Sequence, residues 1–234
     1  MNVFSILKSG FSRPIKALRT ALAILLLVCL SAFLFSCKKE IRYFDYVSEL
    51  RNNVFLASDD EFSLRIYSVE KESPYSADGV PRETNVRTEI WLVAPSGEQE
   101  CNVSFELDGE THGGEMSYDN VKAEYYLSCN LDISTLSTLT CSVVYGETTW
   151  ELTAKSVLSK DTLPAENVLK NLVLSEQELF TSMTDKYGFA GEIYLRLIYE
   201  DSPYYYVGVI DRSGKTNAFL INATSGKILA KRQS

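Results

Sequence analysis

Residues 139–154 read LTCSVVYGETTWELTA and show the pattern that recurs through most of the chain. Apolar and polar side chains alternate over residues 139–145 and again over 148–154, which is the period of a β-strand with one buried face. Gly146-Glu147 has the length and composition of a two-residue hairpin turn. The segment therefore predicts two antiparallel strands joined by a tight turn.

The same alternation occurs upstream, where turn signals such as Asp108-Gly109 separate the runs. These runs lie at residues 62–66, 88–93, 101–107 and 121–129. Six or more short strands in this order predict a β-sandwich over residues 44–155. It is immunoglobulin-like only loosely, because Trp91 precedes every candidate cysteine and Trp150 follows them all.

The pattern changes after residue 156. Residues 156–164 read as a linker, and apolar residues then recur at helical spacing from Ala165. Three strand runs with turn signals follow the helical region. We expect a small helix-plus-antiparallel-sheet domain over residues 165–234, so the predicted fold class is mixed β and α+β.

Residues 219–229 read FLINATSGKIL. This resembles the closing strand of PepSY-type domains, hydrophobic-x-hydrophobic-Asp-Ala-x-Thr-Gly-x-hydrophobic-hydrophobic, with Asn222 and Ser225 in the places of the family's Asp and Thr. The preceding helix and strands follow the family's order, so the resemblance covers residues 165–234. It implies an exported bacterial protein linked to protease inhibition or regulation, and it supplies no catalytic residue.

The N-terminus carries four cations and no acid over residues 1–19, followed by an uncharged, mostly apolar run over 20–37. This order is typical of a secretory signal. Leu34-Phe35-Ser36-Cys37 resembles the lipobox of bacterial lipoproteins, although Phe35 is bulkier than the family's usual residue. The resemblance implies a signal peptide over residues 1–36 and a lipid anchor with palmitate on Cys37, and we expect residues 37–43 to form a short membrane tether.

An uncleaved signal anchor is the alternative, because 18 uncharged residues are close to the lower limit of about 17 for a membrane-spanning helix. Both interpretations place residues 40–234 outside the cytoplasm, anchored to the outer face of the cell membrane. Loss of residues 1–36 would take the formal net charge from −8 to −12. So acidic a chain is not expected to bind nucleic acid, which requires a basic surface.

Three cysteines lie beyond Cys37, and each is in phase with apolar neighbours two residues away. They are Cys101, Cys129 and Cys141. Buried thiols in the core are the preferred interpretation. One disulfide with one free thiol remains open, because exported chains can form disulfides.

His112 is the only histidine, so any enzyme that needs a histidine base would have to use it. It lies between Asp108-Gly109 and Gly113-Gly114, which predicts an exposed flexible loop. The chain has no clustered ligands with metal-site spacing, and the segment that ends in Gly214-Lys215-Thr216 has the wrong glycine spacing for a phosphate-binding loop. We therefore expect no catalytic residue, no metal and no cofactor.

Two features favour binding of a protein or peptide at the cell envelope. The long loop over residues 70–85 holds Tyr75, Asp78 and Arg82, and long ordered loops are often functional. Tyr204 and Tyr206 share the strand face opposite the one expected to pack on the helix. The predicted function is a non-catalytic surface lipoprotein. The alternatives are an envelope hydrolase using His112 or a carboxylate pair, and a purely structural envelope component.

Overall fold

The structure is a computed structural model that describes residues 41–73, 80–95 and 99–234. Residues 1–41 and 42–234 are two units, and the second contains the fold. It is mostly antiparallel β-sheet with two α-helices among the described residues, which confirms the predicted β-rich class.

The first part of the unit contains a 3-10 turn and nine strands. These are η1 (Tyr43–Tyr46), β1 (Val47–Ser58), β2 (Ser63–Glu72), β3 (Thr84–Val93), β4 (Cys101–Leu107), β5 (Glu110–Glu115), β6 (Ser117–Asp119), β7 (Glu124–Cys129), β8 (Thr138–Tyr145) and β9 (Thr148–Ser156). The second part contains α2 (Ala165–Ser175), α3 (Gln177–Ser182), β10 (Thr184–Asp185), β11 (Gly188–Phe189), β12 (Gly191–Tyr199), β13 (Pro203–Asp211), β14 (Thr216–Asn222) and β15 (Ile228–Gln233).

The predicted hairpin turns are present. Tyr145 pairs with Thr148 across Gly146-Glu147. At the β4–β5 turn, both Asp108 and Gly109 have positive φ, 53° and 83°, which is the conformation of a type I′ hairpin turn. These turns confirm that β8–β9 and β4–β5 are antiparallel hairpins.

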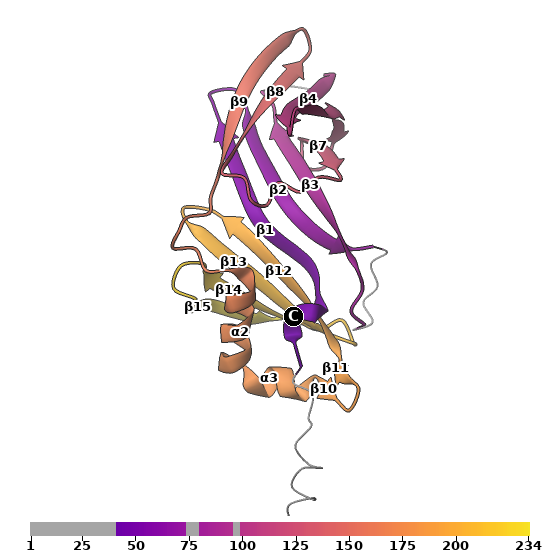
Figure 1. The fold of residues 1–234 in the computed structure, drawn as a ribbon, viewed down its shortest axis with the longest axis vertical. Helices are drawn as coiled ribbons and strands as arrows, with labels where there is room; N and C mark the ends of the chain where they lie inside the picture. Colours follow the sequence, from indigo (N-terminus) through magenta and orange to yellow (C-terminus); the bar gives the residue numbers. More distant parts are fainter. Residues whose placement is uncertain (1–40, 74–79, 96–98) are drawn as a thin grey trace, which may run out of the picture. The chain divides into compact units, whose positions relative to one another are not determined.

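One strand, β1, joins the two predicted regions. It runs antiparallel to β2 along most of its length, and its residues 47–51 pair in parallel with β12. The sheet order is β15-β14-β13-β12-β1-β2-β3-β7-β6, and Figure 1 shows β12–β15 (orange to yellow) continuing the sheet from β1 (indigo). The two regions therefore share one sheet, and their ability to fold separately stays a prediction.

The turn η1 also belongs with the second part of the chain. The Tyr43 ring lies edge-on to Phe180 of α3 and to Phe189 of β11, at centroid distances of 4.9 and 5.3 Å. The backbone N–H of Phe189 donates a hydrogen bond to the Tyr46 hydroxyl. The turn η1 thus packs against the C-terminal region, and β1, which follows it, continues into the other half of the sheet.

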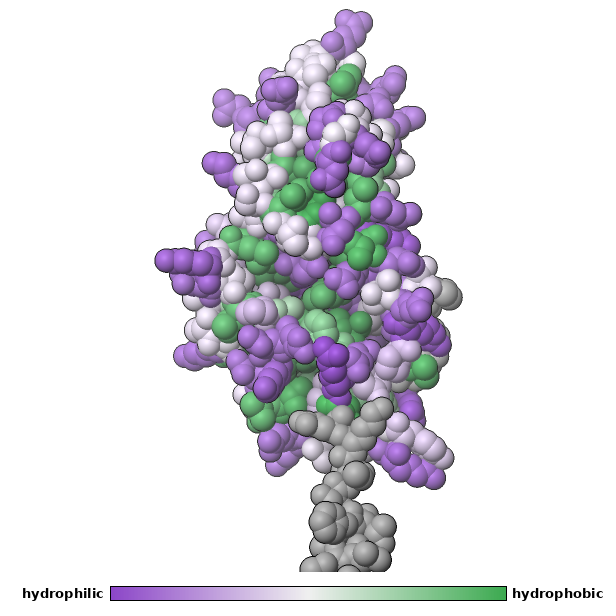
Figure 2. Space-filling view, in the orientation of Figure 1, coloured by the Kyte–Doolittle hydropathy of each residue, from purple (hydrophilic) through white to green (hydrophobic). Residues whose placement is uncertain are grey.

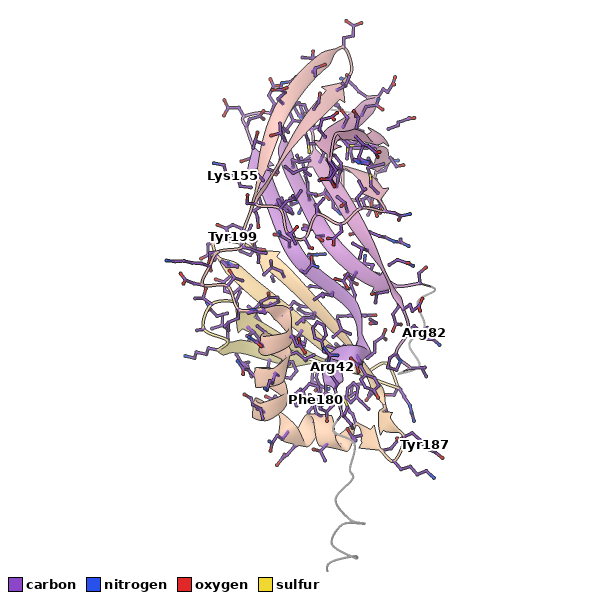
Figure 3. All side chains as sticks on the ribbon, in the orientation of Figure 1. Arg42, Arg82, Lys155, Phe180, Tyr187 and Tyr199 are labelled. Atoms are coloured by element: carbon purple, nitrogen blue, oxygen red, sulfur yellow. The ribbon has the colours of Figure 1, made fainter. Side chains whose placement is uncertain are left out.

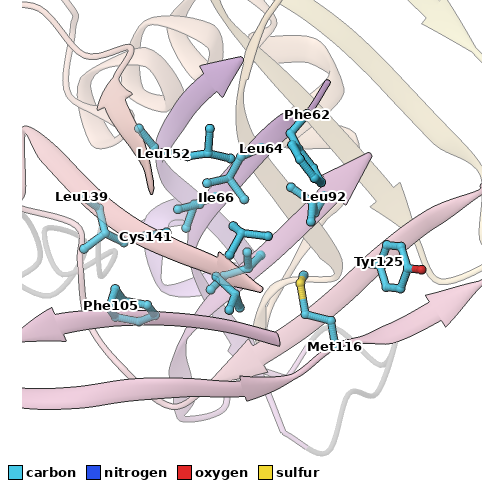
Figure 4. Packing of buried hydrophobic residues seen from close by; sticks show 14 of the residues in the cluster. Phe62, Leu64, Ile66, Leu92, Phe105, Met116, Tyr125, Leu139, Cys141 and Leu152 are labelled. Atoms are coloured by element: carbon cyan, nitrogen blue, oxygen red, sulfur yellow. The ribbon is translucent and has the colours of Figure 1, made fainter. Parts of the chain in front are cut away.

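The larger hydrophobic core lies between the inner faces of β1–β3 and β7 and those of β4, β8 and β9, as Figure 4 shows. Leu64, Ile66 and Ile90 are fully buried there. Cys101 and Cys141 lie in the same cluster, and all three cysteines among the described residues are free. The preferred interpretation of Cys101 and Cys141 as core residues is confirmed, whereas Cys129 at the end of β7 is half-buried.

A second core forms where α2 covers β12–β14. Leu169 and Leu172 of α2 are buried, and Tyr205 and Phe219 are buried on their strands. Residues 156–164 are hydrogen-bonded to both regions. The backbone N–H of Val157 donates to the Val54 carbonyl, and that of Leu163 donates to the Ala223 carbonyl.

The surface shown in Figure 2 is mostly hydrophilic, with hydrophobic residues in separate patches. The most exposed described aromatic is Tyr187, 82% exposed, which Figure 3 places at the turn between β10 and β11. In the part of the chain that the structure describes, no helix is long and apolar enough to cross a membrane.

Candidate binding groove

The face of the sheet opposite the larger core carries charged and aromatic side chains. Alternation along β2 sends Leu64 and Ile66 into the core and therefore places Arg65 and Tyr67 on the other face. The same alternation places Trp91 of β3 on that face. Together with neighbours on β1, β7 and β12, these side chains line a groove with a volume of about 510 Å³. The charged groove consists of Glu49, Arg51, Arg65, Tyr67, Lys71, Glu89, Trp91, Lys122, Glu124 and Arg196.

The three carboxylates of the charged groove are all held by cations of the same groove. Glu49 accepts two hydrogen bonds from Arg196, Nε to Oε1 at 2.8 Å and Nη2 to Oε2 at 2.6 Å. Such a bidentate pair is stronger and more directional than a single bond. The Lys71 ammonium lies 2.7 Å from Glu89 Oε1, and Arg65 pairs with Glu124. These contacts fix the carboxylates in place.

Aromatic rings line the charged groove, with cations stacked on them. The Arg51 guanidinium carbon lies 3.9 Å from the centroid of Tyr67, and Lys122 Nζ lies 4.3 Å from that of Trp91. The Trp91 ring in turn contacts Tyr126, with centroids 4.4 Å apart. Each cation–π contact stabilises the arrangement by about 0.5–1 kcal/mol where it is exposed.

Arg51 differs from the other groove cations. It lies directly opposite Arg196 across the parallel β1–β12 pair, and its Nε is buried without a hydrogen-bond partner. Among the described residues, no carboxylate comes within ion-pair distance of it. Burial lowers the pKa of Arg51. Tyr67 and the Glu49 carboxylate oppose this by raising the pKa, and the charge of Arg196 lowers it further. Arg196 is the opposite case, because burial is outweighed by its hydrogen bonds to Glu49, which raise its pKa.

The charged groove is positive although the chain is acidic. Its five cations exceed its three carboxylates by two charges, while the whole chain has a formal net charge of −8. The Lys71 and Arg196 side chains remain 33% and 32% exposed, so a ligand can reach them. A positive cleft on a negative molecule attracts anionic groups selectively.

Of the loop residues predicted to bind a partner, Tyr75 and Asp78 lie outside the described residues, as does Cys37. Arg82 is described and half-buried, and its backbone N–H donates to Glu72 Oε1 at 3.2 Å. Figure 3 shows it beside the far ends of β2 and β3. Because Glu72 pairs with Thr84, the connection spans residues 73–83 and is shorter than the predicted 70–85.

The structure places the two tyrosines of β13 differently. Tyr206 pairs with Arg196 of β12, whose guanidinium carbon lies 6.0 Å from the Tyr206 ring centroid, so Tyr206 borders the charged groove. The Tyr204 hydroxyl donates to Asp201 Oδ1 at 2.9 Å at the start of the strand. Tyr205 between them is buried on the helix side. A role of Tyr204 and Tyr206 in binding stays a prediction.

His112 lies in strand β5 and not in the flexible loop that its glycine neighbours suggested. It pairs with Phe105 of β4, and the two ring centroids are 5.9 Å apart. Gly113 and Gly114 are part of β5. At Gly113 the backbone of β4 lies too close to leave room for a side chain. A Cβ built there would meet the Val103 carbonyl oxygen at 2.0 Å. His112 is therefore a half-buried strand residue outside the charged groove.

The residues of the charged groove were not predicted from the sequence. The alternation in residues 62–66 already placed Arg65 opposite the core face, so part of the signal was present. The groove, however, needs side chains from β1, β2, β3, β7 and β12, and the order of these strands is a tertiary property. Among the described residues, no group of three or more His, Cys, Asp or Glu side chains could hold a metal ion.

Comparison with known proteins found no match. No protein-family model, no curated protein and no solved structure matches the chain. Function is therefore inferred from the charged groove and from the sequence.

Proposed function

We propose that residues 42–234 form a non-catalytic binding module that holds a protein or peptide in the charged groove at the cell envelope. The observation that carries this proposal is the groove itself, with aromatic rings lining it and cations in excess on an accessible face of the sheet. Its volume of about 510 Å³ falls within the usual range of ligand sites.

The contacts in the charged groove favour binding over catalysis. General acid–base chemistry needs a carboxyl or imidazole group that can exchange a proton with the substrate. Glu49, Glu89 and Glu124 are each held by a cation of the groove, and His112 lies elsewhere, on β5. An envelope hydrolase and a purely structural component remain the alternatives that the experiment below must separate.

The proposed location of the protein rests on the sequence pattern of its N-terminus. We propose that residues 1–36 are a lipoprotein signal and that Cys37 carries the lipid, with an uncleaved signal anchor as the alternative. The described fold begins with Arg42, whose side chain pairs with Asp45 and Glu166. The module would therefore lie within a few residues of the membrane, outside the cytoplasm.

The finer architecture is also part of the proposal, namely a sandwich-like region over 44–155 and a PepSY-like region over 165–234. The order of two helices followed by antiparallel strands supports the second part. So does the turn that Asn222 organises. Its Oδ1 accepts hydrogen bonds from the N–H groups of Thr224 and Ser225 at 3.1 and 2.8 Å. Gly226 follows with a φ of 69°, which favours glycine.

The test is site-specific photocross-linking in intact cells. A photoreactive phenylalanine at Trp91 and, in a second strain, at Tyr206 should capture the same protein or peptide, identified by mass spectrometry. The same amino acid at Leu229 on β15, which is 48% exposed, is the control and should capture nothing. Equal capture from Leu229 would show that capture is not specific to the groove and would count against the proposal. With no capture from either groove position, loss of a hydrolytic activity in His112→Ala would favour the enzyme alternative, and no such activity would favour the structural one.

A further inference from the structure

We infer that the charged groove binds an acidic peptide segment, and that Arg51 receives a carboxylate of this segment. The inference rests on the proposed function and names the ligand class of the same site. It starts from a row of three arginines of which, among the described residues, only Arg196 has an ion-pair partner.

Three arginines lie in one row across four neighbouring strands. Arg196 of β12 is opposite Arg51 of β1, Arg51 is opposite the buried Val69 of β2, and Val69 is opposite Arg87 of β3. Like charges that face each other across strands destabilise a sheet. Only Arg196 is neutralised, by Glu49. The described residues supply no ion-pair partner for Arg51 or Arg87, and the Nε atoms of both are buried without an acceptor.

A carboxylate matches what Arg51 lacks. The guanidinium is planar and binds planar acceptors through two parallel N–H···O bonds. Stacking on Tyr67 at 3.9 Å supports one flat face of Arg51, so the guanidinium is already oriented before a ligand arrives. Because the Arg51 Nε is buried, a ligand carboxylate would accept hydrogen bonds from the terminal guanidinium nitrogens, compensate the charge of Arg51 and screen it from Arg196.

The remaining groove residues favour a peptide over a densely charged anion. Glu49, Glu89 and Glu124 line the same space and would repel a phosphate or a sulfated polymer more strongly than a single carboxylate. Trp91 and Tyr126, whose rings are tilted by 42°, provide an aromatic surface beside which an apolar side chain or a peptide backbone can pack. A segment with one acidic residue among uncharged ones fits both properties.

The experiment measures binding to the purified full-length protein in detergent by isothermal titration calorimetry. The probes are an N-acetylated, C-amidated hexapeptide with one glutamate among five glutamines, called the glutamate peptide, and its uncharged match, hexaglutamine. We expect saturable binding of the glutamate peptide only. Arg51→Gln should weaken it by at least about tenfold, because hydrogen bonds to a charged group are lost. Arg51→Lys should weaken it less, because the charge stays while the planar fork is lost. Arg232→Gln, an exposed cation on β15, is the matched control and should change nothing.

Thermal unfolding checks that the variants fold. If Arg51→Gln does not fold, Arg51→Lys and Tyr67→Leu, which removes the ring under Arg51, carry the test and should both weaken binding. Unchanged affinity in these variants, equal binding of hexaglutamine, or tighter binding of inorganic phosphate or dextran sulfate than of the glutamate peptide would overturn the inference. If the partner captured at Trp91 and Tyr206 is still captured by the Arg51→Gln variant, the inferred acidic ligand is wrong, but the proposed function stands. Arg51-dependent binding of the glutamate peptide without capture in cells would support the ligand class and count against the proposed function.

Discussion

At the scale of single residues, the buried thiols and the charged groove show opposite uses of polar chemistry. Cys141 is fully buried among apolar side chains, and burial raises the pKa of its thiol to about 12. The thiol is therefore a small core residue that keeps its proton. Arg51, by contrast, keeps its charge on a partly accessible face and pairs with no carboxylate of the described chain.

The buried thiols predict that stability falls at alkaline pH. The pKa of Cys141 rises on folding from 9.0 to about 12. The stability that the buried Cys141 thiol contributes is therefore fully present below pH 9 and is lost as the pH rises toward 12. Burial acts in the same direction on Cys101, raising its pKa to about 11. Each such group should remove about 1.4 kcal/mol of unfolding free energy per pH unit in this window.

Urea unfolding of the wild type and Cys141→Ala between pH 8 and 11 measures this effect. The variant should be less stable at pH 8, because core contacts are lost, but its stability should decline less steeply with pH. Cys129→Ala is the control, since Cys129 is only half-buried and should alter the slope less. Parallel pH profiles for the wild type and Cys141→Ala would show that the Cys141 thiol does not titrate with unfolding.

At the scale of elements, the β4–β5 hairpin depends on glycines for two distinct physical reasons. Gly109 has a φ of 83° with nothing near its missing Cβ, so only the backbone conformation demands glycine there. Gly113 has a φ of 126°, and a Cβ would also collide with the β4 backbone. The close approach of β5 to β4, and with it the position of His112, therefore requires Gly113.

This difference predicts the outcome of two alanine substitutions. Gly109→Ala should destabilise by about 1–2 kcal/mol, the cost of a left-handed conformation for alanine. Gly113→Ala should destabilise by more than that, because backbone atoms of Val103 and Ser104 must also move. Urea denaturation midpoints at constant m-value compare the two. Equal effects would mean that β5 can shift away from β4 without cost.

At the scale of the whole molecule, β1 makes the two predicted regions into parts of one sheet. It pairs with β2 on one side and with β12 on the other, while η1 packs on α3 and β11. The charged groove exists because of this connection, since Arg196 of β12 meets Glu49 and Arg51 of β1 there.

Cleaving the connecting segment tests how strongly the regions depend on each other. Residues 158–161 are exposed, so a specific protease site inserted after Lys160 should be cut readily. We expect the two fragments to remain together in size-exclusion chromatography, because β1 of the first fragment still pairs with β12 of the second. Separate, folded fragments would instead establish the two autonomous domains that the sequence predicts.

The mass of the membrane-extracted protein tests the proposed processing and lipidation at Cys37. If Cys37 is lipidated, the membrane-extracted protein should have the mass of residues 37–234 plus lipid, and Cys37→Ala should abolish processing. An unprocessed chain from Met1 in both proteins would favour the signal anchor. Ser36→Phe, which changes the lipobox but keeps the cysteine, serves as a second variant and should also block processing.

Local pattern was sufficient for much of the fold. The alternation of residues 139–145 and 148–154 predicted β8 and β9 closely, because one buried face imposes a period of two wherever a strand lies. Asp108-Gly109 predicted its turn for an equally local reason, the need for positive φ. The change to helical spacing near Ala165 marked the start of α2. His112 was misplaced because neighbouring glycines signal a loop locally, whereas here they permit close strand packing.

Tertiary structure alone decided which strands became neighbours. Alternation tells which face of β2 is buried, but the parallel pairing of Arg51 with Arg196 joins residues far apart in sequence, and the segment 44–56 carries no local mark of its partner. Strand order follows from how all the buried faces pack together, which no short window of sequence contains. The charged groove, built from side chains of five strands and of the β6–β7 turn, could therefore be recognised only after the chain had folded.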